Sequence, residues 1–249
     1  MNILTKKLTT IILFSFLMTL FHSAQSQILI SLLLGDKLNS PNLEFGVEGG
    51  LNTSFLSGID ESEGLSHLHL GFFFDIRMKN DVWLNTGLRI KSNVGAKNID
   101  PYSLEDERLD LVFEDGQISR KIGYYYVPVH LKYRFGERKQ FFVNVGGQAG
   151  LRLKANDYFF NTYKNKDDVS FNNNIGDHIK RIDAGFSGGL GYKFKGSGMN
   201  LGLTYYHGLM NIMKPTDLEQ FNYASKNSSL YLYVDIPIGA GYKEPKDKN

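Results

Sequence analysis

The feature that most constrains this chain is a period-two alternation of apolar and polar residues, repeated along eight segments. A β-strand points successive side chains to opposite faces, so this alternation indicates strands with one apolar and one polar face. The segments span residues 43–54, 67–78, 82–94, 121–135, 140–154, 181–194, 199–209 and 228–238. The sequence therefore predicts an all-β fold of eight antiparallel strands.

The connections between these segments alternate between short and long. The short ones are residues 79–81, 136–139 and 195–198, and the long ones are 55–66, 95–120, 155–180 and 210–227. Outer-membrane barrels have short turns on the periplasmic side and long loops on the outer side. We therefore expect an eight-stranded antiparallel up-and-down transmembrane β-barrel with short periplasmic turns and long outer loops.

The first residues have the features of an export signal. Lys6 and Lys7 precede an apolar run at residues 11–21, and Ala24 and Ser26 precede the expected cleavage point. A retained membrane helix is the alternative, but it needs about 20 apolar residues. We predict a cleaved signal peptide at 1–26, a periplasmic N-terminal segment at 27–42, the barrel at 43–240 and a polar periplasmic tail at 241–249.

Composition excludes several kinds of site and partner. The chain has no cysteine, which excludes disulfides, cysteine nucleophiles and cysteine-based metal sites. The whole chain carries a formal net charge of +2, and loss of residues 1–26 removes two lysines and no acid. The mature chain is then neutral, whereas nucleic-acid binding favours a basic surplus. We therefore expect no nucleic-acid partner.

Alternation alone does not decide whether the apolar face of the strands forms a buried core or contacts lipid. A soluble lipocalin-like barrel would bury the apolar face as its core, whereas a membrane barrel turns that face toward lipid. Two observations favour the membrane: the strands are long enough to cross a bilayer obliquely, and aromatic residues gather near their ends. Localisation in the cell outer membrane, with its lipids as partners, follows as the expectation.

The polar face of the predicted strands is rich in charge of both signs. The interior of an eight-stranded barrel is just wide enough for side chains to fill it, so opposite charges there can pair. We predict a lumen charge network made by Glu44, Glu48, Asp75, Arg77, Arg89, Lys91, His130, Lys132, Arg134, Arg152, Asp183, Lys193 and Asp235. The same register places Lys154 on this face.

Three stretches resemble the PorT-like outer-membrane β-barrel family. They are residues 36–40 (DKLNS), 43–52 (LEFGVEGGLN) and 124–133 (YYYVPVHLKY). Pro128, Lys132 and Tyr133 match the family's Tyr-x-Glu-Ile-Pro-x-x-x-Lys-Tyr pattern, while Tyr126 stands where the family has Glu. The resemblance implies an eight-stranded barrel in a Gram-negative outer membrane. The family takes its name from a protein linked to the secretion of surface proteases.

Histidines and acids raise two chemical alternatives. His67 and His69 lie two residues apart on one strand, and with His130 as a third ligand they would hold a metal. Asp183, His130 and His207 are the candidates for an acid–histidine hydrolase. Hydrogen bonding within the lumen explains these residues more simply, so we expect no cofactor and no enzymatic activity.

The expected role is that of a structural or interaction component of the envelope, with a filled, non-porin lumen. Envelope or secretion proteins are the expected partners, and a link to secretion is one option. The loop at 95–118 has seven acids against two bases, which suits a solvated outer loop, or else the binding of divalent cations or of a basic partner. A narrow transport pore, an outer-membrane enzyme and a soluble ligand-binding barrel are the alternatives.

Overall fold

The computed structural model describes residues 40–163 and 167–238. The predicted signal peptide, residues 27–39 of the N-terminal segment and the tail at 241–249 lie outside the described residues. The strands are β1 (Leu43–Leu56), β2 (Glu63–Lys79), β3 (Val82–Ile99), β4 (Gln117–Phe135), β5 (Phe141–Tyr163), β6 (Asp167–Asn174), β7 (Ile182–Lys193), β8 (Asn200–Gly208) and β9 (Asn227–Pro237). The helices are α3 (Glu107–Phe113) and the 3-10 turn η1 (Glu219–Phe221). Neither is long and apolar enough to cross a membrane, and no other helix lies in the described part of the chain.

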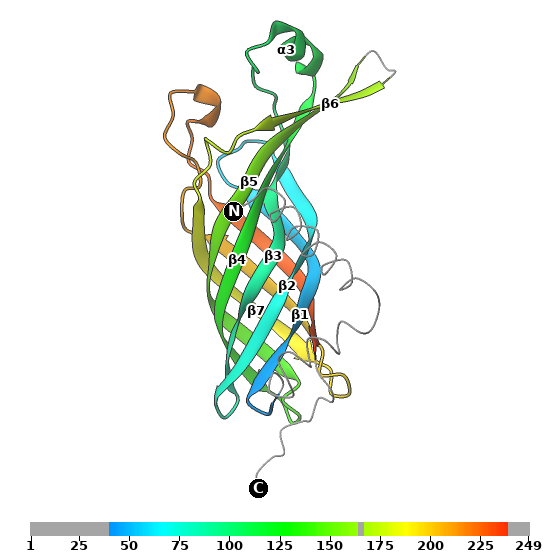
Figure 1. Cartoon of the computed structure of the whole chain (residues 1–249), viewed down its shortest axis with the longest axis vertical. Helices are drawn as coiled ribbons and strands as arrows, with labels where there is room; N and C mark the ends of the chain where they lie inside the picture. The colour runs from blue at the N-terminus through cyan, green and yellow to red at the C-terminus, as the bar shows by residue number, and fades with distance from the viewer. Residues whose placement is uncertain (1–39, 164–166, 239–249) are drawn as a thin grey trace, which may run out of the picture.

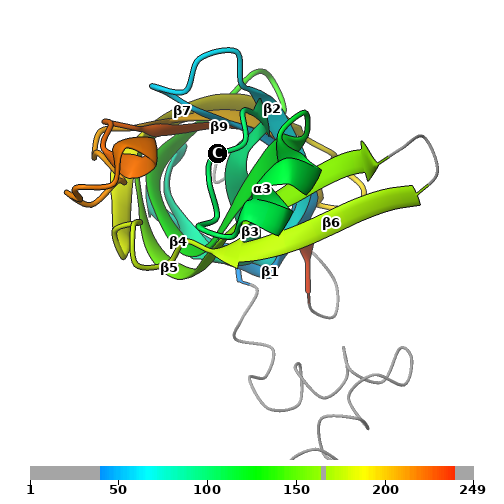
Figure 2. The ribbon, with the colours of Figure 1, turned by 90° about the horizontal axis from the view of Figure 1, so that it is seen from above.

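Eight of the strands form a closed antiparallel ring. Sequence neighbours pair from β1 to β5, β5 pairs with β7, and the ring closes between β9 and β1. Figure 2 shows this ring end-on, with α3 above it and β6 directed away from it. The up-and-down eight-stranded ring agrees with the sequence prediction.

The ninth strand, β6, was not expected. It pairs antiparallel with the C-terminal part of β5, from Asn156↔Asn174 to Tyr163↔Asp167, and it is not one of the eight strands of the ring. The segments predicted as loops at 95–120 and 155–180 are thus partly strand. β3, β4 and β5 continue past their predicted ends because each keeps an antiparallel partner there. In Figure 1 these extensions, α3 and β6 form a head at one end of the barrel.

Three short turns close the opposite end of the ring. The turn between β2 and β3 has Asn80 at φ 50°, and the turn between β4 and β5 has Gly136 at φ 92°. Gly198, at φ 69°, serves the turn between β7 and β8. A positive φ is least costly for Gly and Asn, which explains these residues at the tight turns. We call this the short-turn end, and the opposite end, with the head, the long-loop end.

Side chains of the ring are apolar outside and polar inside. Along β4, Val129 and Leu131 are 51% and 52% exposed, whereas His130 and Lys132 are 1% and 0% exposed. The outward apolar face of β4 runs from Tyr125 to Phe135, which matches the roughly 9–11 residues that a strand needs to cross a bilayer. A soluble lipocalin-like barrel requires the reverse arrangement, so that alternative is wrong.

Two β-bulges interrupt the alternation near the head. One adds a residue to β3 between Arg89 and Ser92, and the other adds a residue to β5 between Arg152 and Lys154. An extra residue reverses the side to which the following side chains point. Lys91, predicted in the lumen, is therefore exposed outside the ring, and Lys154 is exposed as well.

Candidate functional site: the filled lumen and the long-loop head

Charged side chains fill the short-turn end of the lumen. Arg134 donates from both terminal nitrogens to the two Glu44 oxygens at 2.8 Å, and Lys193 Nζ lies 2.5 Å from Glu44 Oε1. Lys132 Nζ donates to both oxygens of Asp75, at 2.9 and 2.7 Å, and Arg134 also reaches Asp75. Two carboxylates and three cations thus form one connected, buried network.

A second group lies deeper in the lumen. Arg89 Nε donates to Glu48 Oε1 at 2.6 Å, and Arg89 Nη1 donates to Gln148 at 2.5 Å. The guanidinium lies 4.3 Å from the ring centroid of Tyr231, a cation–π contact. His69 Nε2 lies 3.4 Å from Glu48. Burial of one cation with its carboxylate keeps the charges compensated.

Three further predicted members of the lumen network have uncharged hydrogen-bond partners. His130 bonds Asn85 at 3.2 Å and Ser187 at 2.6 Å, one through each ring nitrogen. Asp183 accepts from Tyr126 and Asn227, at 2.9 and 3.1 Å. Asp235 accepts from Asn200 at 3.2 Å. These three predicted network members lie in the lumen with amide or hydroxyl partners.

Arg77 and Arg152 lie outside the charge network. Arg77 is half-buried at the short-turn end, where its Nε donates to the Asn80 carbonyl. Arg152 is half-buried at the level of the β5 bulge, and its Nε has no hydrogen-bond partner among the described residues. With Lys91 outside the ring, three of the thirteen predicted members do not join the ion-paired or hydrogen-bonded groups of the lumen. For Arg77 and Arg152 the alternation did not reveal the depth along the axis, and for Lys91 the bulge reversed the side.

An apolar core closes the lumen at the long-loop end. Phe113 of α3 meets Phe159 of β5 with ring centroids 5.7 Å apart, and Tyr102 contacts both Phe159 and Phe221 at 5.1 Å. Inward residues of β3, β4 and the long connections complete this core, namely Val94, Ala96, Ile118, Ile122, Ile175, Ile179, Ile212 and Met213. The loops therefore fold back over the ring as a packed head.

One buried ion pair crosses the head core. Arg120 donates to Asp157 through Nε and Nη2, at 2.8 and 2.6 Å, and both side chains are buried. Tyr102 donates to Asp157 at 3.0 Å, and Arg120 donates to the Tyr223 hydroxyl. Burial lowers the pKa of Arg120, but the hydrogen bonds and charge of Asp157 outweigh it and raise that pKa above its usual value. The guanidinium is a fixed positive charge.

Sequence reasoning missed Arg120 and Asp157 because both fall in segments predicted as loops. A signal for them exists. Ile118, Arg120 and Ile122 continue the inward side of β4 at period two, and Ala155, Asp157 and Phe159 do so for β5 after the bulge. The longer strands could have been read from this continued alternation.

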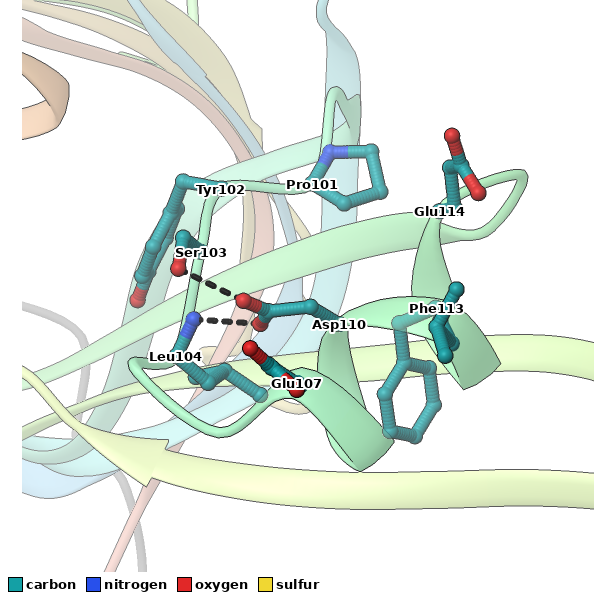
Figure 3. Close-up of a pocket in the computed structure, with 9 residues that line it drawn as sticks. Pro101, Tyr102, Ser103, Leu104, Glu107, Asp110, Phe113 and Glu114 are labelled. Atoms are coloured by element: carbon teal, nitrogen blue, oxygen red, sulfur yellow. Dashed lines mark hydrogen bonds between the residues drawn. The ribbon is translucent and has the colours of Figure 1, made fainter.

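A surface hollow of about 500 Å³ lies beside α3 (Figure 3). Asp106 begins the helix by accepting from the N–H groups of Arg108 and Leu109, which lowers the pKa of its carboxyl group. Asp110 accepts from the Ser103 hydroxyl at 2.6 Å and the Leu104 N–H at 2.7 Å. The rest of the lining is acidic and apolar, with Glu107, Glu114, Leu111, Phe113 and Pro101.

The histidines proposed for a metal site or a hydrolase site have separate surroundings in the structure. His69 packs edge-on against Tyr231, and His67 lies toward a hollow on the outer wall. No group of three or more potential ligands is arranged to hold a metal among residues 40–163 and 167–238. His207 packs near Tyr205, whereas His130 and Asp183 have the separate partners described above.

A closed antiparallel ring with an apolar exterior and a charged, filled interior defines a β-barrel protein of the cell outer membrane. The chain belongs to the outer membrane protein beta-barrel domain family, whose model matches residues 24–214. No curated protein matches the chain. The PorT-like subdivision is a finer assignment than this family match.

Several solved outer-membrane proteins are similar to the chain. Ail, the attachment invasion locus protein of Yersinia pestis, has 11% identity and a TM-score of 0.40, over 79% of this chain and 98% of Ail. Neisserial surface protein A has 12% identity and a TM-score of 0.41, over 77% and 96%. OprG from Pseudomonas aeruginosa has 12% identity and a TM-score of 0.41, over 79% and 93%.

Proposed function

We propose that this protein is a non-enzymatic interaction component of the envelope, a PorT-like barrel that presents its head to another envelope protein at the cell surface. The short turns then face the periplasm and the long-loop end faces outward, as in other outer-membrane barrels. The observation that carries the proposal is the double closure of the lumen, by the charge network and by the head core. Because the interior is filled, we expect the protein to contact its partner through its surface.

The head surface beside α3 is the proposed contact. Leu111 is 71% exposed at the helix, the highest value among the exposed large apolar side chains of residues 40–163 and 167–238. Glu107 and Glu114 line the hollow next to it, and α3 has acids in its first turn and no basic residue in its last turn. An apolar residue within an acidic rim favours a partner segment that is basic and carries an apolar side chain.

Site-specific crosslinking on intact cells tests this contact. A photo-crosslinking residue at position 111 should capture an envelope protein, and the paired change Glu107→Lys and Glu114→Lys should reduce that yield by ten-fold or more. Leu218 is the matched control, because it is an exposed leucine on another long connection. Equal yields from positions 111 and 218, both unaffected by the charge reversal, would contradict the α3 contact.

A link to secretion is the second candidate, and it rests on the pattern around Pro128. The matching Lys132 anchors Asp75 in the lumen, so the shared residues support the barrel wall and its network. Cells that lack this protein should then retain surface-directed proteins in the periplasm. Unchanged amounts of secreted protein in the culture medium would remove the secretion role while leaving the head contact open to its own test.

A further inference from the structure

A cluster of lysines lies on the outer wall of the barrel, at the boundary between the apolar exterior and the head. Lys91 of β3, Lys121 of β4 and Lys154 of β5 line one hollow of about 360 Å³, together with His67, Asn93 and Tyr158. We call it the basic hollow. Its volume is in the range of small-ligand sites, about 300–1,000 Å³. The three lysines come from three adjacent strands.

The two bulges create this cluster. Without the extra residues on β3 and β5, the alternation would turn Lys91 and Lys154 into the lumen. Bulges often re-aim a side chain at a functional position. Here both bulges lie beside Tyr124 of β4, which pairs with Ser92 on one side and Arg152 on the other, and they bring two lysines to the same outer surface as Lys121.

Gly123 and an interrupted ladder lie next to residues that line the basic hollow. Gly123 opposes Asn93 on one side and Lys154 on the other. A Cβ atom at Gly123 would lie 3.3 Å from Asn93 Oδ1 and 3.4 Å from Lys154 Cγ, so these side chains already close over it. The β2–β3 ladder shifts register between the Gly64↔Ala96 and Leu70↔Lys91 pairs, next to His67.

The cations of the basic hollow have no acidic partner within the described residues. No ion pair of residues 40–163 and 167–238 includes Lys91, Lys121 or Lys154, whereas nearby Lys97 is paired with Glu63 at 3.0 Å. Lys121 Nζ lies 4.7 Å from the Tyr158 ring centroid. His67 Nδ1 is buried without a hydrogen-bond partner in the same part of the chain. Several donors therefore converge with no anion among them.

The position of the basic hollow indicates what the anion is attached to. On β3 the outward residue before Lys91 is Ile90, and on β5 Leu153 precedes Lys154. Tyr125 is the last apolar outward residue of β4 before Gly123 and Lys121. The lysines thus border directly on the surface that faces acyl chains. An anion on a molecule with acyl chains fits both surfaces at once.

We propose that the basic hollow binds the phosphate group of a membrane lipid of the outer leaflet, whose acyl chains lie along the adjacent apolar wall. The lysine ammonium groups supply charge and hydrogen bonds to the phosphate oxygens, and the His67 imidazole supplies one further hydrogen bond. Because lysines near a membrane surface favour anionic headgroups, the three of them should favour a lipid with a net negative phosphate over a net-neutral lipid by roughly ten-fold or more.

Native mass spectrometry of the folded mature protein in detergent tests the site. Wild-type protein, titrated with phosphatidic acid or phosphatidylcholine, should retain one phosphatidic acid with at least ten-fold preference. Changing Lys91, Lys121 and Lys154 together to Gln should reduce this preference to about one. The control changes Lys97, Lys214 and Lys226 to Gln, three lysines outside the basic hollow with the same total loss of charge, and it should keep the wild-type preference.

Inorganic phosphate, added as a competitor, distinguishes the source of the anion. A lipid site requires the acyl contacts, so millimolar phosphate should displace little phosphatidic acid. Efficient displacement by inorganic phosphate, or equal loss of preference in the control, would overturn the proposal. If the triple variant does not give the folded protein, Lys121→Glu alone should abolish the preference, and an unchanged preference in that variant would also overturn it.

Discussion

At the scale of single residues, the head depends on one compensated pair of charges. Arg120 and Asp157 are buried among aromatic and aliphatic side chains, and each satisfies the other. Removal of one partner from a buried pair leaves an isolated charge, which is more costly than removal of both. The two single variants and the double variant therefore separate charge compensation from packing.

We expect Asp157→Asn to destabilise the head by about 3–5 kcal/mol, because Arg120 loses its counter-ion in an apolar core. The double change Arg120→Leu with Asp157→Leu should cost much less. Amide hydrogen exchange in the outer halves of β4 and β5 measures the effect. The membrane-embedded ring should keep its protection in both variants, and equal loss of protection in the single and double variants would contradict the role of the ion pair.

Acid should loosen the start of α3. Backbone N–H groups of Arg108 and Leu109 hold the pKa of the Asp106 carboxyl group below its ordinary value of 3.8. A lowered folded-state pKa stabilises the helix above the ordinary value, and this stabilisation is lost as pH falls through the folded-state pKa. Exchange of these two amides, corrected for its intrinsic pH dependence, should rise below about pH 4. Asp106→Asn keeps a capping oxygen without a charge and should remove that pH dependence.

Sequence patterns assigned most lumen residues to the correct side of the wall, and the exceptions have a physical cause. Glu44, Asp75, Lys132 and Arg134 follow simple alternation and meet in one network. Lys91 and Lys154 do not, because one inserted residue in each strand reverses the side. Bulge positions depend on how neighbouring strands pair, so a single strand's sequence does not reveal them.

At the scale of elements, closure of the ring depends on how closely β1 approaches β9. A Cβ atom at Gly50 would lie 2.0 Å from the Leu232 carbonyl oxygen, a backbone atom that cannot move aside alone. Gly49 differs, because its Cβ would lie 3.3 Å from a methyl group of the Leu70 side chain. These neighbouring glycines therefore form a matched pair.

We expect Gly50→Val to prevent closure between β1 and β9, while Gly49→Val still closes. Folded barrels migrate faster than unfolded chains on gels run without boiling, which gives a direct readout. The Gly50 variant should lose most of the fast-migrating form, and the Gly49 variant should retain it. A normal fast-migrating band for both variants would show that the pairing of β1 with β9 accommodates the added side chain.

The number and order of ring strands were predictable because lipid on one side and a charged lumen on the other impose strict alternation. The head was less predictable. Its strands leave the bilayer, and there the outward face becomes polar, as with Ser119 and Asn156, so the contrast between faces weakens. β6 adds a strand outside the ring, where neither lipid nor lumen imposes a pattern.

At the scale of the whole molecule, the double closure of the lumen predicts a protein without steady ion conductance. In planar bilayers, the wild-type barrel should leave the membrane resistance unchanged. Arg89→Ala removes one cation from the deeper lumen group but leaves the short-turn network and the head core in place. It should therefore remain closed too, and a stable conductance step in either protein would revive the pore alternative.

β5 has a mechanical consequence for the molecule. Its 23 residues correspond to about 75 Å of extended chain, from the short-turn end to the hairpin with β6. β4 pairs with it along most of this length, and β7 pairs with its lower half. A pull on the projecting hairpin would load these ladders in shear, across many hydrogen bonds at once. Peeling would break the bonds one after another, so these ladders should resist a pull along β5 better than a pull across it.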